Sequence, residues 1–151
     1  MSFFPVHGRP GTASPAATQQ IFLQGLTAKE WSRLYTFADV RSFMAGEELV
    51  RAGDADDAFY VMTAGAAEVL QGTRSIGQIS EGSVFGEVAF FDRQPRSATI
   101  RALEAGSAAR FSRVSFENLA AWEPVLARRM LYELGAALAM RLRAAESRQD
   151  R

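Results

Sequence analysis

The sequence lacks the residues from which most catalytic sites are built. It has no cysteine and a single histidine, His7, among its 151 residues. A thiol nucleophile, a thiolate zinc site, a disulfide and a cysteine-held iron–sulfur cluster are therefore excluded. His7 stands in a stretch rich in proline and glycine, where a histidine is usually solvated, so neither a histidine metal site nor a Ser-His-Asp triad is expected. The commonest catalytic residue sets are therefore absent, and we expect no enzyme, no metal and no cofactor.

The sequence also lacks an excess of positive or negative charge, and it lacks long apolar runs. Seventeen basic residues balance 17 acidic ones, so the formal net charge is +0. A protein that coats nucleic acid needs a cationic surplus, so direct nucleic-acid binding is not expected. The longest small-or-apolar run, 134–140, is far shorter than the roughly 20 residues that span a bilayer. Because the first ten residues also lack the pattern of a signal peptide, we expect a cytoplasmic protein without a membrane contact.

The residues that are present suit one domain. The hydrophobic fraction of 48% supplies a core, and 151 residues leave little room for a second domain. Residues 1–20 are rich in proline and glycine and have no apolar period, which predicts a flexible leader before a domain over 21–147. Thr27 and Glu30 form a capping-box pattern, which predicts an N-terminal helix over 27–38.

Short β-prone runs separated by glycines occupy residues 40–113. This pattern of short β-prone runs and glycines predicts an antiparallel sandwich or barrel. The weakest β stretch, 71–77, is interpreted as a hairpin turn. The chain then becomes helical over 115–147, with a short helix over 115–122 and a long one after Pro124. The fold class is therefore α+β, an antiparallel β-sandwich with an N-terminal helix and C-terminal helices.

The long helix carries two apolar stripes. One contains Leu131, Leu134, Leu138 and Leu142, and the other contains Leu126, Met130, Ala137 and Met140. One stripe can cover the β domain. The second either packs within the same fold or forms the seam of a homodimer, and the sequence leaves both open.

The segment 82–99 holds the candidate binding residues. Gly86 lets the backbone approach a bulky or charged group closely, and a helical turn after it would point free amides at the same place. Arg96 is a natural bidentate partner of phosphate, and Ser97 adds a hydroxyl. Glu87 is an acceptor among these donors. The combination suits a ligand that has both a phosphate and sugar hydroxyls.

The spacing within this segment resembles the phosphate-binding cassette of the cyclic nucleotide-binding domain family. That family includes the regulatory subunits of cAMP-dependent protein kinase, the catabolite activator protein and cyclic nucleotide-gated channels. The similarity runs from about residue 21 to residue 143. The motifs that carry it are Phe85-Gly86-Glu87-x-Ala89, Arg96-x-Ala98-Thr99, Phe43-x-Ala45-Gly46-Glu47-x-Leu49 and Gly53-Asp54-x-x-Asp57-x-Phe59-Tyr60-Val61.

The resemblance implies a jelly-roll fold in which Glu87 binds the ribose 2′-hydroxyl and Arg96 binds the exocyclic phosphate oxygens. Ser97 favours cAMP, because family members that prefer cGMP often have threonine there; cGMP and cyclic di-GMP stay open as ligands. The candidate ligand-binding residues are Phe85, Gly86, Glu87, Val88, Ala89, Arg96, Ser97 and Ala98.

The resemblance also implies a lid. Val88 and Phe91 would pack the cassette helix against the C-terminal helices, and the last helix would close over the base and pass the signal to an unidentified effector protein. The candidate lid residues are Leu131, Leu134, Gly135, Leu138 and Arg141. Transcription regulators of the family continue into a DNA-binding domain after this helix, whereas this sequence ends at Arg151, so we expect a stand-alone sensor. A ligand-free interaction or scaffold domain with the same fold stays open.

Overall fold

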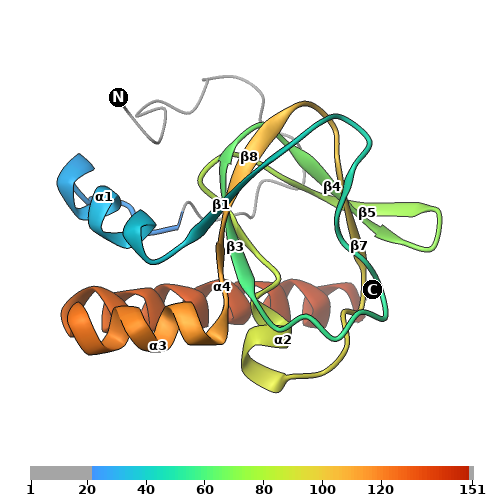
Figure 1. The fold of residues 1–151 in the computed structure, drawn as a ribbon. Coiled ribbons are helices and arrows are strands. Elements are labelled where there is room, and N and C mark those ends of the chain that lie inside the picture. Colours follow the sequence, from blue (N-terminus) through green and yellow to red (C-terminus); the bar gives the residue numbers. More distant parts are fainter. Residues whose placement is uncertain (1–21, 150–151) are drawn as a thin grey trace.

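Two antiparallel sheets form the centre of the fold (Figure 1). The computed structural model describes residues 22–149, so the predicted leader over 1–20 lies outside the described residues. One sheet has the strand order β1-β8-β3-β6 and the other β2-β7-β4-β5. The strands are β1 (Asp39–Phe43), β2 (Glu48–Val50), β3 (Phe59–Ala64), β4 (Ala67–Gln71), β5 (Arg74–Ile79), β6 (Val84–Phe85), β7 (Thr99–Ala102) and β8 (Gly106–Phe111). The predicted α+β class with a jelly-roll sandwich is confirmed.

The helices of the fold pack together against the first sheet of this sandwich. They are α1 (Ala28–Thr36), α2 (Glu87–Asp92), α3 (Arg113–Trp122) and α4 (Pro124–Gln149). The predicted capping box is present in α1, since the Thr27 hydroxyl accepts from the Glu30 amide and the Glu30 carboxylate accepts from the Thr27 amide. Pro124 takes the first position of α4, which runs beside α3 under the sheets in Figure 1. Among residues 22–149, none of the helices has the length and hydrophobicity of a transmembrane segment.

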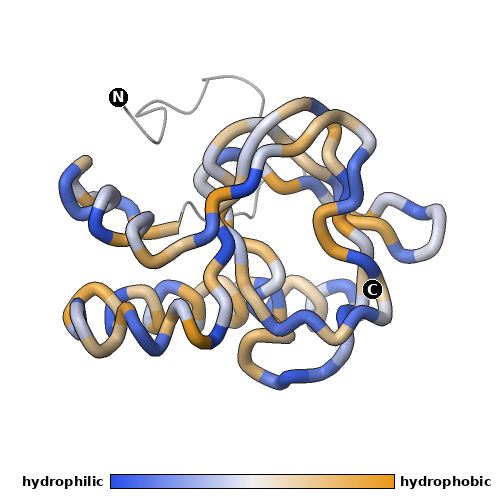
Figure 2. Tube along the Cα trace, in the orientation of Figure 1, coloured by the Kyte–Doolittle hydropathy of each residue, from blue (hydrophilic) through white to orange (hydrophobic). Residues whose placement is uncertain are grey.

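The core has two apolar clusters. One lies between the two sheets and includes Phe43, Met62, Ile79 and Ile100. The other joins the first sheet to the helices and is centred on Phe59, which is 0% exposed. Figure 2 shows apolar and polar residues alternating along α3 and α4, as expected for helices with one face on this second cluster. The N-terminal half of α4 is therefore fixed to the body of the domain.

The segment 71–77 is not the broad turn that the sequence predicts. β4 and β5 continue almost to each other, with Gln71 paired to Arg74 and only residues 72 and 73 in the turn. β5 is an edge strand whose residues are mostly exposed, ending on the buried Ile79. An edge strand with a solvated face needs few apolar residues, so its sequence carries a weak β pattern.

Candidate functional site

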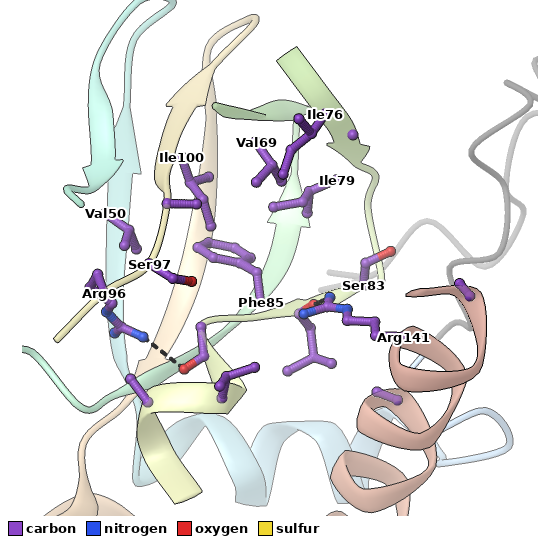
Figure 3. A pocket seen from close by; sticks show the side chains of 18 of the residues that line it. Val50, Val69, Ile76, Ile79, Ser83, Phe85, Arg96, Ser97, Ile100 and Arg141 are labelled. Atoms are coloured by element: carbon purple, nitrogen blue, oxygen red, sulfur yellow. Dashed lines mark hydrogen bonds between the residues drawn. The ribbon is translucent and has the colours of Figure 1, made fainter. Parts of the chain in front are cut away.

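A cavity of about 870 Å³ lies between the second sheet, the cassette and the C-terminal half of α4 (Figure 3). This volume is within the range of small-molecule sites in proteins. Seven of the eight predicted site residues line it, namely Phe85, Gly86, Val88, Ala89, Arg96, Ser97 and Ala98. The sheet contributes an apolar wall made of Val50, Val69, Ile76, Ile79 and Ile100. The site thus combines this apolar surface with polar groups on two sides of it, Arg96 and Ser97 on one and Ser83 and Arg141 on the other (Figure 3).

Arg96 is the buried cation of this cavity, with a side chain only 3% exposed. Its Nη1 donates to the Gly86 carbonyl at 2.7 Å, the contact drawn in Figure 3. Its Nη2 donates to the Ala58 carbonyl at 2.6 Å and to the Asp56 carboxylate at 3.0 Å. Nε is buried and has no hydrogen-bond partner among residues 22–149. Because a buried N–H without a partner is costly, this donor is suited to an incoming anion.

The cassette backbone is shaped to hold that guanidinium. Gly86 has a φ of 78°, a left-handed conformation that favours glycine. A Cβ at this position would lie 2.9 Å from Arg96 Nη1 and 3.1 Å from the Ala58 carbonyl oxygen. The Arg96 backbone is fixed in turn, since its amide donates to the Asp54 carbonyl at 2.8 Å. The close approach expected at Gly86 is therefore the approach of the protein's own arginine.

Asp56 is a partner of the cavity residue Arg96 that the sequence did not single out. Its carboxylate accepts from Arg96 at 3.0 Å, from Arg110 at 2.8 Å and from the Tyr60 hydroxyl at 3.1 Å. Burial alone would raise its pKa, but the hydrogen bonds from Arg96, the Ala58 amide and Arg110 outweigh burial and lower the pKa to about 2. The sequence offers three nearby aspartates, at 54, 56 and 57, and no pattern that selects this one.

Replacing Asp56 should change how stability depends on acid. A carboxyl whose pKa is lowered on folding stabilises the native state above its unfolded value of 3.8, and this contribution is lost as the pH falls toward about 2. We expect Asp56→Asn to lower the free energy of unfolding at neutral pH and to flatten its decline between those two values. Urea unfolding at several pH values measures both effects. Asp39→Asn, at an exposed ion pair, is the control, and parallel acid curves for Asp56→Asn and the parent would contradict the prediction.

Glu87 is the predicted site residue that does not line the cavity. Its side chain is 0% exposed, and Oε1 accepts an ion-pair hydrogen bond from Arg141 on α4. Oε2 is buried without a hydrogen-bond partner among the described residues. Arg141 also donates to the Val84 carbonyl at 3.0 Å and itself lines the cavity. Figure 3 shows it reaching from α4 toward the strand that carries Phe85. The glutamate is thus beside the site but covered by Arg141.

The packing face of the cassette helix differs from the expectation. Val88 and Phe91, expected to pack on the C-terminal helices, are 45% and 43% exposed. Phe90 packs there instead, with its ring 5.5 Å from that of Phe116 and the Arg113 guanidinium 4.7 Å above it. A helix of six residues has too few turns for an apolar period to identify its buried face.

Only one of the five candidate lid residues lines the cavity. That residue is Arg141, whereas Leu134 is buried in the core and Leu131 is 40% exposed. The α4 residues that line the cavity follow helical spacing along one face and are Ala137, Met140, Arg141, Ala144, Ser147 and Arg148. Within residues 22–149 no group of three His, Cys, Asp or Glu side chains is placed to hold a metal ion.

Known proteins share both the sequence pattern and the fold. A cGMP-dependent protein kinase of Toxoplasma gondii is 37% identical over 83 residues, which are 55% of this chain and 8% of that protein. A cAMP-dependent protein kinase regulatory subunit of Emericella nidulans is 33% identical over 99 residues, which are 64% of this chain and 24% of that protein. The chain therefore spans less than a quarter of the length of these relatives.

The solved structures agree in fold. The Thermus thermophilus catabolite activator protein superposes with a TM-score of 0.72 and 26% identity, over 84% of this chain and 60% of that one. Residues 40–121, more than half of the sequence, match the family model of the cyclic nucleotide-binding domain. Since this range contains the whole cassette and the cavity wall of the sheets, the chain belongs to the cyclic nucleotide-binding domain family.

Proposed function

We propose that the cavity binds a cyclic mononucleotide, with cAMP as the first candidate, and that the chain is a regulatory module and not an enzyme. The observation that carries this proposal is Arg96, a buried cation held against Gly86 with a free Nε. A buried guanidinium is a strong partner for a phosphodiester anion. Ser97, on the same cavity wall, adds a hydroxyl to the anion site.

The rest of the cavity fits the other parts of such a ligand. The branched side chains of Val50, Val69, Ile79 and Ile100 offer an apolar surface to the flat base. The names of the relatives support this class of ligand, since one is cAMP-dependent and another cGMP-dependent. cGMP and cyclic di-GMP are the alternative ligands, and a ligand-free scaffold is the alternative function.

We also propose that α4 carries the signal to an effector protein. Its C-terminal half lines the cavity on one face and is open on the other. Leu131 and Leu142, both on the first apolar stripe, are 40% and 62% exposed. Leu134 of the same stripe is buried in the core, as are Leu126 and Met130 of the second stripe. The exposed pair supports a homodimer or an effector contact along this helix.

Titration calorimetry with cAMP, cGMP and cyclic di-GMP tests the ligand proposal. We expect one cAMP bound per chain, with a rise in the melting temperature that grows with ligand concentration. Incubation with cAMP should leave it intact, because among residues 22–149 no three His, Cys, Asp or Glu side chains are grouped to hold a metal ion that would activate water. If none of the three nucleotides binds or shifts the melting temperature at millimolar concentration, the scaffold alternative replaces this proposal; formation of AMP would show an enzyme.

A further inference from the structure

Asp56 joins two arginines that come from distant parts of the chain. Arg96 stands between the cassette helix α2 and strand β7, whereas Arg110 lies on strand β8 of the first sheet. Asp56 Oδ2 accepts from Arg96 Nη2 at 3.0 Å, and Oδ1 accepts from Arg110 Nη2 at 2.8 Å. Each oxygen of this carboxylate is therefore used by a different guanidinium.

Arg110 has no place among the residues that line the cavity. It is nevertheless held close to the anion site, because its carboxylate partner is also the partner of Arg96. The Tyr60 hydroxyl donates to the same carboxylate at 3.1 Å, and the Tyr60 ring stacks at 4.9 Å on Phe85, which does line the cavity. A second cation is thus fixed one carboxylate away from Arg96 without facing the ligand.

The cluster of Arg96, Asp56 and Arg110 has one positive charge in excess, since it contains two cations and one carboxylate. Arginine stays protonated in proteins. Asp56 stays ionised as well: its burial raises the pKa, but the hydrogen bonds that it accepts outweigh burial and lower the pKa to about 2. Arg96 and Asp56 alone would form a neutral pair, which attracts an anion far less than a cluster with a net positive charge.

We propose that Arg110 is a positioning residue of the anion site, because by sharing the Asp56 carboxylate it leaves the charge of Arg96 available to the phosphate of a ligand. The inference rests on the proposed function, since it requires an anionic ligand on Arg96. The phosphate is then the second anion of the cluster, and each guanidinium has an anionic partner. Without Arg110, the phosphate has to compete with Asp56 for a cation that Asp56 already neutralises.

Arg110→Gln removes the second cation and keeps a side-chain amide that can still donate a hydrogen bond. We expect this variant to bind cAMP about tenfold more weakly than the parent in titration calorimetry. Arg110→Lys keeps the charge and should recover most of the lost affinity. Arg101→Gln is the matched control, because it removes an arginine from an exposed ion pair with Glu68 on the second sheet, and it should bind like the parent.

Charge sharing and a merely structural role predict different orders of affinity. Asp56→Asn raises the excess to two positive charges, so it should bind cAMP at least as tightly as the parent although it is less stable. Asp56→Asn/Arg110→Gln restores an excess of one and should bind more tightly than Arg110→Gln. A structural role predicts that affinity falls with every hydrogen bond lost from the cluster. Weaker binding by folded Asp56→Asn than by the parent would overturn the proposal, even if Arg110→Gln fails to fold.

The Asp56 carboxyl reports the sharing without ligand. The groups that face it are the Arg96 and Arg110 guanidinium groups, the Tyr60 hydroxyl and the Ala58 amide. Its carbon chemical shift, followed by NMR against pH, should give a higher pKa in Arg110→Gln than in the parent, since burial then acts against one cation fewer. Arg101→Gln should titrate like the parent.

The titration separates this proposal from the proposed function. An unchanged pKa of Asp56 in Arg110→Gln would overturn the sharing, whatever the ligand. If the parent binds none of the three nucleotides, the proposed function fails, and the role of Arg110 in binding fails with it. A raised pKa in Arg110→Gln would then still show that Arg110 shares the Asp56 carboxylate with Arg96.

Discussion

Arg96→Ala is expected to weaken cAMP binding by about a hundredfold or more, because truncating one member of a buried charge pair costs about 3–5 kcal/mol. The substitution removes the donor offered to the phosphate. It also leaves the carbonyls of Gly86 and Ala58 without the hydrogen bonds of 2.7 and 2.6 Å that they receive from this side chain. Titration calorimetry of the parent and the variant measures the ratio of their dissociation constants.

The folding role of Arg96 has to be separated from its binding role. Arg96→Lys keeps the charge but loses the planar fork, so it should fold and still bind more weakly than the parent. Arg93→Ala is the matched control, because Arg93 is an exposed cassette residue. Equal affinity of a folded Arg96→Ala variant and the parent would remove Arg96 from the binding site.

Phe59→Ala is expected to lower the free energy of unfolding by about 3–5 kcal/mol, the range for a fully buried aromatic ring. The Phe59 ring stacks on Phe111 at 5.0 Å and meets Phe90 edge-on at 4.9 Å. It therefore joins strand β8 to the cassette helix. The cavity left by its removal would loosen the attachment of α2 as well as the core.

Urea denaturation of Phe59→Ala measures this loss. Phe91→Ala is the control, since that ring belongs to the same helix α2 as Phe90 but is 43% exposed and should cost far less. A similar loss in the two variants would show that the aromatic cluster around Phe59 is not the centre of the core. Because the loss is a large part of the stability of a small domain, the variant is best studied at low temperature.

The local parts of the site could be predicted from the sequence. Gly86 and Arg96 are only ten residues apart. Because the connecting segment is short, the two residues have to lie near each other in the fold. Pro124 and the Thr27–Glu30 pair mark helix starts for the same reason, since a cap acts within one turn. The prediction that Phe91 packs on the C-terminal helices was wrong, and Phe90 packs there instead. A six-residue helix is too short for an apolar period to identify its buried face.

The partners of these residues could not be predicted. Asp56 is 40 positions from Arg96, and Arg141 is 54 positions from Glu87. Neither pair has a sequence signal, because a salt bridge over such a separation depends on where whole elements pack. The sequence pattern around a charged residue is the same whether its side chain is solvated or forms a salt bridge with a distant segment.

The alternation of β-prone runs with glycines thus indicated an antiparallel sandwich or barrel from the sequence alone. The motifs of the sequence carried the resemblance that implied the family, the jelly-roll and the segment of the candidate ligand site. Which cations and carboxylates neutralise one another depends on the tertiary structure. It joined Arg96 to Asp56 and covered Glu87 with Arg141, because packing α4 against the sandwich places side chains from distant segments within hydrogen-bond distance.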